Sequence, residues 1–243
     1  MPDDTVSAAL LAIARDVDDD RALARLICRA CVDGLGVDGA ALSLLTAQVG
    51  RHTLHATDAT AELLEELQFT LNEGACIEAA TTGSPVLVSD LRERGASARW
   101  PVFTAAVIER TEVRALFALP LQWGTTNLGV IDLYRRVPEG LNDTERRDAI
   151  GAADTATLMM LTLRTDPPDR GGARPEDQSW LDPAVASRAE IHQATGMVLM
   201  QLDVGADAAL ARMRAHAFVE GRLLIEVARD VVARRLLFTP DMD

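Results

Sequence analysis

The sequence predicts an α+β domain, an antiparallel sheet with flanking helices, followed by a small all-α domain of three helices. Two pairs of apolar segments with hairpin spacing alternate with helical patterns in the first two thirds of the chain. Residues 165–179 then contain three prolines, two glycines and six charges, with no apolar residue larger than alanine. Such a stretch is typical of a linker. Beyond it the pattern is helical only.

The first domain begins with two helical patterns in residues 5–35, separated by DVDDD. Asp18, Asp19 and Asp20 are expected to cap the second helix, which Gly34 ends. Residues 38–45 and 51–57 form a predicted strand pair around a turn at 48–50. Further helices are expected at 61–68, 74–83, 100–113 and from Asn142 onward, and further strands at 85–91, 114–123 and 125–136.

The last segment carries three amphipathic helical patterns, the first from about 183 to 202. Helices this short are stable only when they pack on one another or on a partner. A glycine, Gly196, interrupts the first pattern, where it costs roughly 1 kcal/mol relative to alanine. Two reasons for it remain open: tight packing of a neighbouring helix, or the close approach of a nucleic acid.

Composition limits the function. The net charge is −13, and every basic residue is arginine. An acidic chain is a poor nonspecific nucleic-acid binder, but the imbalance is concentrated before residue 180. No apolar run approaches the ~20 residues of a membrane span, and the acidic start does not fit a secretory signal. We therefore expect a cytoplasmic protein without membrane contact.

Cysteine and histidine usage suggests neither a disulfide framework nor a metal site. Cys28 and Cys31 lie upstream of His52 and His55, but the histidine spacing is short for zinc and their strand would turn the rings to opposite faces. Buried free thiols are the simpler interpretation. No phosphate loop or nucleophile elbow is present, so we expect no catalytic residues and no cofactor.

The middle of the first domain resembles a GAF domain over about residues 21–163. The matching segments are NEGACIEAATTGSPVLVSDL, WPVFTAAV and ALFALPLQWGTTNLGVIDLYRR, in the pattern of actinobacterial members. Asn72 and Ala75 depart from the family pattern at loop positions. The resemblance implies a sensory domain that binds an unknown small ligand or dimerises. The residues expected to line a ligand pocket are Leu42, Phe69, Cys76, Phe117, Leu119 and Ile131.

The C-terminal segment is similar to the ANTAR domain of transcription antitermination regulators, through SRAEIHQATGMVLM, ADAALARMRAHA and GRLLIEVARDVV. The third helix lacks the lysine that usually follows its first arginine. The resemblance implies binding to stem-loops in nascent transcripts, which prevents terminator formation. The resemblance places Ala194, Gly196, Arg214 and Arg222 at positions of the family pattern. Helical spacing adds Arg188, His192 and Thr195, which share one polar face of the first helix. The RNA-binding candidates are therefore Arg188, His192, Ala194, Thr195, Gly196, Arg214 and Arg222.

Together these features predict an N-terminal helical extension (1–20), a GAF sensory domain (21–163), a linker (164–180) and an ANTAR domain (181–243). We expect a homodimer joined through the helix at 142–163, either alone or together with the N-terminal helix, so that two ANTAR modules act together. Two alternatives remain: a small-molecule sensor that acts through protein contacts without RNA, and a DNA-binding regulator that uses Arg229, Arg234 and Arg235.

Overall fold

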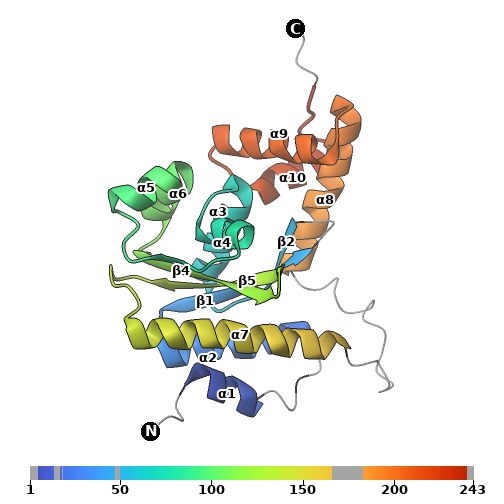
Figure 1. The fold of residues 1–243 in the computed structure, drawn as a ribbon. Helices are drawn as coiled ribbons and strands as arrows, with labels where there is room; N and C mark the ends of the chain where they lie inside the picture. The colour runs from blue at the N-terminus through green and yellow to red at the C-terminus, as the bar shows by residue number, and fades with distance from the viewer. Residues whose placement is uncertain (1–4, 14–16, 18, 47–49, 166–182, 240–243) are drawn as a thin grey trace. The chain divides into compact units, whose positions relative to one another are not determined.

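The computed structural model describes residues 5–13, 17, 19–46, 50–165 and 183–239 (Figure 1). The chain separates into two compact units, Met1–Pro168 and Asp169–Asp243. Residues 166–180 of the expected linker lie outside the described residues, as does most of the turn expected at 48–50. Each unit is therefore described by itself.

The first unit contains the mixed helices and strands that the sequence predicts. Its helices are α1 (Val6–Ile13), α2 (Asp20–Leu35), α3 (Ala59–Leu71), α4 (Ala75–Thr82), α5 (Arg94–Arg99), α6 (Pro101–Arg110) and α7 (Asp143–Thr165). Its strands are β1 (Gly39–Thr46), β2 (Gly50–Ala56), β3 (Val86–Val88), β4 (Ala115–Trp123) and β5 (Thr126–Arg135). The short helix α5 was not anticipated.

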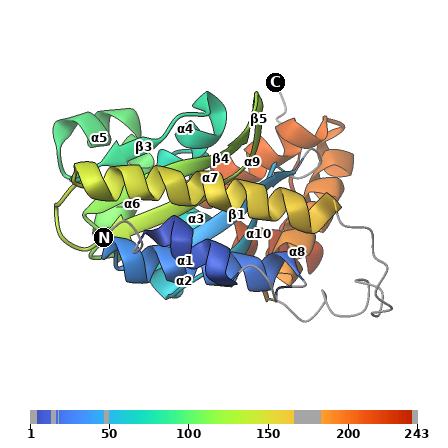
Figure 2. The same cartoon turned by 60° about the horizontal axis from the view of Figure 1, so that its bottom comes forward.

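The five strands form one antiparallel sheet in the order β2-β1-β5-β4-β3. Helices α1, α2 and α7 cover one face, and α3, α4 and α6 lie on the other (Figures 1 and 2). Because both faces are covered, residues 115–121 of β4 are all buried, as expected for a strand read as a continuous apolar run.

Side chains at the predicted positions cap the helices. Asp19 accepts hydrogen bonds from the backbone N–H of Arg21 at 2.9 Å and of Ala22 at 2.8 Å, which confirms the capping expected of the acidic triplet. Gly36, rather than Gly34, ends α2 in the left-handed conformation. The side chain of Asn142 caps α7, accepting from residues 144 and 145.

The strands alternate between two different interiors. Leu42, Phe117 and Ile131 belong to the core cluster shared with α2 and α7. Their neighbours Ser43 and Asp132 lie outside that cluster, because successive side chains of a strand point to opposite faces. One interior is therefore mainly apolar, with the buried Arg135 guanidinium bound to the carbonyl of Leu35 and to Glu145, whereas the interior beneath α3 and α4 contains a cluster of polar groups.

The second unit consists of α8 (Pro183–Leu202), α9 (Ala206–Val219) and α10 (Leu224–Val232), so the predicted three-helix organisation is confirmed. Among the described parts of both units, no helix combines the length and apolarity needed to cross a membrane.

A substitution at Gly129 can test the close approach of β5 to β1. A Cβ on this residue would lie 2.2 Å from the backbone oxygen of Ser43, and backbone cannot move aside cheaply. We expect Gly129→Ala to lower the free energy of unfolding by ~2 kcal/mol or more, measured by urea denaturation. The control is Gly95→Ala in α5, where nothing lies within 4 Å and stability should be unchanged or raised by up to ~1 kcal/mol. Equal effects of the two substitutions would contradict this account.

Candidate nucleic-acid interface

The three C-terminal helices pack through one apolar side of each. Alanines on all three helices alternate with larger aliphatic side chains and let the helix axes come close. The buried residues are Ile191, Ala194 and Val198 of α8, Ala209, Met213 and Ala217 of α9, and Leu224, Ile225, Val227, Ala228 and Val231 of α10. The opposite side of α8 consequently faces solvent.

Gly196 lies on this exposed side of α8. Among the residues that the structure describes, a Cβ built on it would meet no atom within 4 Å. No neighbouring helix therefore requires a glycine here, and packing within the unit does not explain the ~1 kcal/mol that the residue costs in a helix. Of the two reasons left open by the sequence, the approach of another molecule is the one compatible with this environment.

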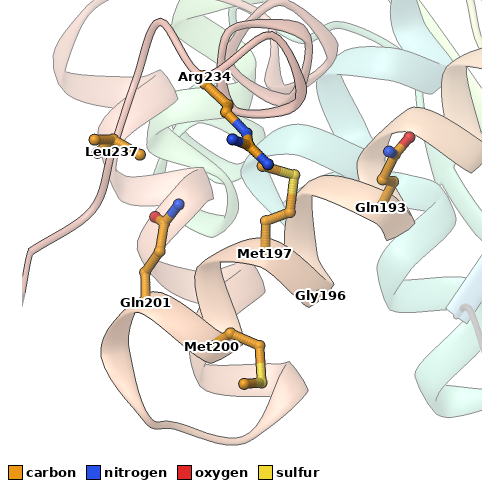
Figure 3. A pocket seen from close by; sticks show the side chains of 7 residues that line it. All are labelled: Gln193, Gly196, Met197, Met200, Gln201, Arg234 and Leu237. Carbon is orange, nitrogen blue, oxygen red and sulfur yellow. The ribbon is translucent and has the colours of Figure 1, made fainter.

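A groove runs beside Gly196, between α8 and the chain that follows α10 (Figure 3). It has a volume of about 600 Å³. Gln193, Met197 and Gln201, spaced four residues apart, form one row along α8. The complete lining is Gln193, Gly196, Met197, Met200, Gln201, Arg234 and Leu237. The floor is thus an amide, a thioether and a second amide, beside a position without a side chain.

Two contacts hold the outer wall of the groove in place. The backbone N–H of Phe238 donates to Oε1 of Gln201 at 2.9 Å, which ties the chain after α10 back to α8. The ring of Phe238 also meets the ring of His216 edge to face, with centroids 5.4 Å apart. These contacts hold the chain after α10 against α8 and α9 and so form the outer wall of the groove.

The lining combines a cation with exposed apolar surface. It contains Arg234 and no acidic residue, although the chain as a whole carries a charge of −13. Met200 is 78% exposed and Leu237 is 63% exposed, which is high for large apolar side chains. This chemistry suits a ligand with flat apolar surface next to negative charge.

Of the predicted RNA-binding residues on α8, Gly196 and His192 are accessible. His192 is exposed one turn before Gly196 on the same side of the helix. The side chain of Arg188 lies outside the described residues. Thr195 is half-buried, and its hydroxyl donates to the carbonyl of Ile191 at 2.7 Å.

Ala194 does not lie where an RNA contact requires it. Its exposed fraction is 0%, because the side chain is enclosed between α8 and its partner helices. A small side chain at this position lets the neighbouring helices pack closely. Ala194 is therefore a packing residue, and this part of the predicted interface is corrected.

Arg222 forms internal ion pairs instead of facing a ligand. Its guanidinium donates to Asp230 at 2.6 Å and to Glu220 at 3.1 Å. Arg235 pairs with the same Asp230 carboxylate at 2.6 Å. Hydrogen bonds from Arg222 and then Arg235 lower the pKa of Asp230 below its usual value. This carboxylate ties the start and end of α10 together.

The other arginines of the unit differ in their surroundings. Arg229 donates to Glu190 at 2.9 Å, which links α10 to α8. Arg214 is half-buried on α9. Arg234 lines the groove, although the sequence suggested it only for the DNA-binding alternative. It reaches this place because α10 ends at Val232 and Arg234 adopts the left-handed backbone conformation (φ 57°). No local sequence signal announces that turn, since arginine seldom occupies it.

The residues predicted to form a ligand pocket in the first unit do not gather at one place. The structure puts Leu42, Phe117, Leu119 and Ile131 in the apolar cluster with α2 and α7. Phe69 and Cys76, from α3 and α4, belong to the opposite side of the sheet. The prediction joined apolar positions from both faces, whereas the two-residue period of a strand separates them. The prediction of a single pocket lined by all six residues is therefore wrong.

A polar cluster that the sequence did not predict surrounds Cys76. The ligand atoms of Glu65, Cys76 and Asp132 lie within 4.8 Å of one another. Thr53 donates to Glu65 at 3.0 Å, and Ser43 also donates to the same carboxylate oxygen. Carboxylates and a thiol are groups that bind metal ions or polar ligands. Their separation along the chain explains why no short motif revealed them.

Cys28 and Cys31 are buried free thiols in α2, as expected. Burial, aided by nearby negative groups, raises the pKa of Cys28 well above its usual value. Burial also raises the pKa of Cys31 to about 12. Both thiols therefore stay protonated and act as small apolar side chains.

Each of the two units is matched by the model of a known domain family. A GAF domain model matches residues 18–160, and an ANTAR domain model matches residues 181–232. These are sensor and regulatory domains. The chain belongs to the GAF domain family, and its order of domains makes it a GAF-ANTAR domain protein. No curated protein matches it.

Solved structures resemble the first unit in fold. The GAF domain of an Acinetobacter phosphoenolpyruvate-protein phosphotransferase is 9% identical with a TM-score of 0.52, covering 68% of this chain and 96% of its own. The GAF domain of a phosphoenolpyruvate-protein phosphotransferase (ptsP) from Coxiella burnetii is 11% identical with a TM-score of 0.54, covering 65% and 92%. At this identity the likeness establishes the GAF fold alone.

The environment of Gly196 predicts the effect of an alanine there. Because the added methyl group meets open space, Gly196→Ala should raise the free energy of unfolding of the helical unit by ~0.5–1 kcal/mol. Thermal unfolding followed by circular dichroism measures this. Gly221→Ala is the matched control: it also meets open space, but its φ of +64° should make alanine cost about 1 kcal/mol. A destabilising Gly196→Ala would restore a packing role for the glycine.

Proposed function

We propose that this protein is a signal-responsive transcription regulator without enzymatic activity. Its ANTAR domain binds stem-loop RNA in nascent transcripts and promotes antitermination, and its GAF domain acts as sensor and dimerisation module in the cytoplasm. One observation carries the proposal: α8 presents a solvent-facing glycine that the fold does not need, next to a groove with a cation. ANTAR domains are RNA-binding antitermination modules, and this exposed side lies in the matched segment.

The chemistry of the exposed side suits an RNA loop. Loop bases are unstacked, and proteins recognise them by stacking, by hydrogen bonds to base edges and by cations on the phosphates. His192 and Arg234 supply planar cationic or polar groups, and Gln193 supplies an amide. A position without a side chain at Gly196 lets the nucleic-acid backbone approach the helix.

The DNA-binding alternative receives less support from the geometry. It requires Arg229, Arg234 and Arg235 on one recognition helix. Arg229 and Arg235 are engaged with Glu190 and Asp230, and Arg234 lies beyond the end of α10. The arginines are therefore not arrayed along a helix that could enter a major groove.

RNA binding is tested with Gly196→Leu. A leucine side chain on the exposed side would block close approach without disturbing the buried side, so hairpin RNA should bind at least ~10-fold more weakly, equivalent to about 1.4 kcal/mol. Filter binding of the full chain to transcript-derived hairpins measures the loss. The GAF unit should unfold at the same temperature as in the parent protein.

The control for added bulk is Ala211→Leu, at an exposed position of α9. It should leave hairpin affinity within twofold. Unchanged affinity in Gly196→Leu would remove this side of α8 from the interface. Duplex DNA binding in place of hairpin binding would favour the alternative regulator, and binding to neither would favour a sensor that acts through protein contacts.

The GAF unit is proposed to bind a small signal molecule on the side of the sheet covered by α3 and α4. This side contains two of the pocket candidates, Phe69 of α3 and Cys76 of α4, and the polar groups Glu65 and Asp132. A polar ligand could exchange hydrogen bonds with that cluster. The apolar interior on the opposite side is already filled by α2 and α7.

Dimerisation is proposed through α7 together with α1, as the sequence suggested. Ile150 and Leu158 are 37% and 51% exposed on α7, and Leu11 is 62% exposed on α1. Exposed large apolar side chains of this kind are ones that a second copy can cover, and the exposed Asp154 lies between the two on α7. Two linked ANTAR modules would then engage two stem-loops with increased avidity.

The double variant Ile150→Glu, Leu158→Glu tests this seam. Charged side chains would lose solvation on burial against a second copy, so the variant should be monomeric where the parent chain is dimeric. Light scattering at micromolar concentration distinguishes the 26.2 kDa chain from its dimer. Val137→Glu, at an exposed loop position, is the control and should leave the mass unchanged. A monomeric parent protein would contradict the proposed seam.

A further inference from the structure

We infer that the groove beside Gly196 accepts one unpaired nucleobase of the RNA loop, with the adjoining phosphate next to Arg234. This inference rests on the proposed RNA-binding function and assigns a specific place to one part of the ligand. The groove is formed by the seven residues that line it in Figure 3, all from the second unit. Its volume of about 600 Å³ is ample for a single nucleotide.

The thioether of Met197 provides the surface on which the base lies. Met197 occupies the middle of the row on α8, and it and Arg234 point toward one another (Figure 3). A methionine sulfur makes favourable contacts with aromatic rings and adapts to their shape. With no side chain at Gly196, the sugar attached to the base can lie against the helix. The groove thus offers a surface on which a nucleobase can stack, in a chain that has few aromatic side chains for this purpose.

The amides at the two ends of the row have different roles. Oε1 of Gln201 already accepts the Phe238 N–H, so this amide fixes the wall. Gln193 is exposed at the other end of the groove and carries one donor group beside one acceptor. That pair complements a base edge on which a donor and an acceptor are adjacent. Gln193 therefore reads the edge of the bound base.

Charge favours a nucleotide over an uncharged apolar segment. The lining holds one cation, Arg234, and no carboxylate. Arg235 is its matched neighbour: its guanidinium binds Asp230, whereas Arg234 faces the groove. A phosphate beside a bound base would be attracted to Arg234 and would release a counterion on binding. An apolar peptide would gain nothing from this cation.

The experiment uses the full chain and a pool of RNA hairpins with one fixed stem and a randomised loop. The tightest hairpin is then prepared with each loop base removed in turn. We expect one position whose removal weakens binding at least ~10-fold in the parent protein. The Met197→Ala variant should bind the intact hairpin about as weakly as the parent protein binds the hairpin that lacks this base. Removing the base should then weaken binding to Met197→Ala little further, because the substitution and the base removal delete the same contact.

Two further variants separate the groove from the general surface. Arg234→Gln should reduce the salt dependence of binding by about one phosphate contact, whereas Arg235→Gln should not. Val219→Ala removes an apolar side chain that is 81% exposed on α9 outside the groove, and it should behave like the parent protein. Circular dichroism verifies that each variant keeps the helical unit folded.

The outcomes distinguish this inference from the function on which it rests. If hairpins bind but the effects of base removal and Met197→Ala simply add at every loop position, the groove is not the base site, although RNA binding stands. If no hairpin in the pool binds, the proposed function and the groove assignment both fail. Loss of affinity in Val219→Ala equal to that in Met197→Ala would also overturn the assignment.

Discussion

The burial of one side of α8 against α9 and α10 determines what its other side can do. Ala194 and Val198 are fully enclosed, and a helix turns 100° with each residue. Gly196, two residues after Ala194, must therefore point almost directly away from the core. The same packing that stabilises three marginal helices also exposes the glycine that weakens α8. Stability therefore depends on one side of α8, and the proposed RNA binding on the opposite side.

Charge in the helical unit is used mainly to hold the unit together. Asp230 binds both Arg222 and Arg235, and Glu190 binds Arg229. Pairs of this kind, at half-exposed positions, add modestly to stability and fix the ends of α10. Counting arginines in the sequence therefore overstates the cationic surface offered to RNA. The proposed interface relies on shape and base contacts more than on bulk phosphate attraction, which fits the acidic composition of the chain.

The sheet of the first unit separates two interiors with different chemistry. The side covered by α1, α2 and α7 is mainly apolar, with Arg135 buried at its edge, so it serves stability and, through the outer surface of α7, the proposed dimer. The side covered by α3 and α4 encloses Glu65 and Cys76 beside Asp132. Buried polar groups are costly unless they are satisfied. A sensor needs such a place, because a ligand can then exchange specific contacts with the protein.

The sequence by itself determined the elements and their order. Helical periodicity located α8 from about 183 to 202, and the family patterns identified both domains. The acidic triplet at 18–20 and the pair Asn142 and Asp143 marked helix starts, within which the structure selects Asp19 and Asn142. Caps and periodicity are readable in this way because they depend on residues a few positions apart. The tertiary structure alone decided which of these residues could be reached. Ala194 became a packing residue, and Arg234 joined a groove through a left-handed turn and a bond from Phe238 to Gln201. Those outcomes depend on contacts between segments distant in the chain, which no local pattern encodes.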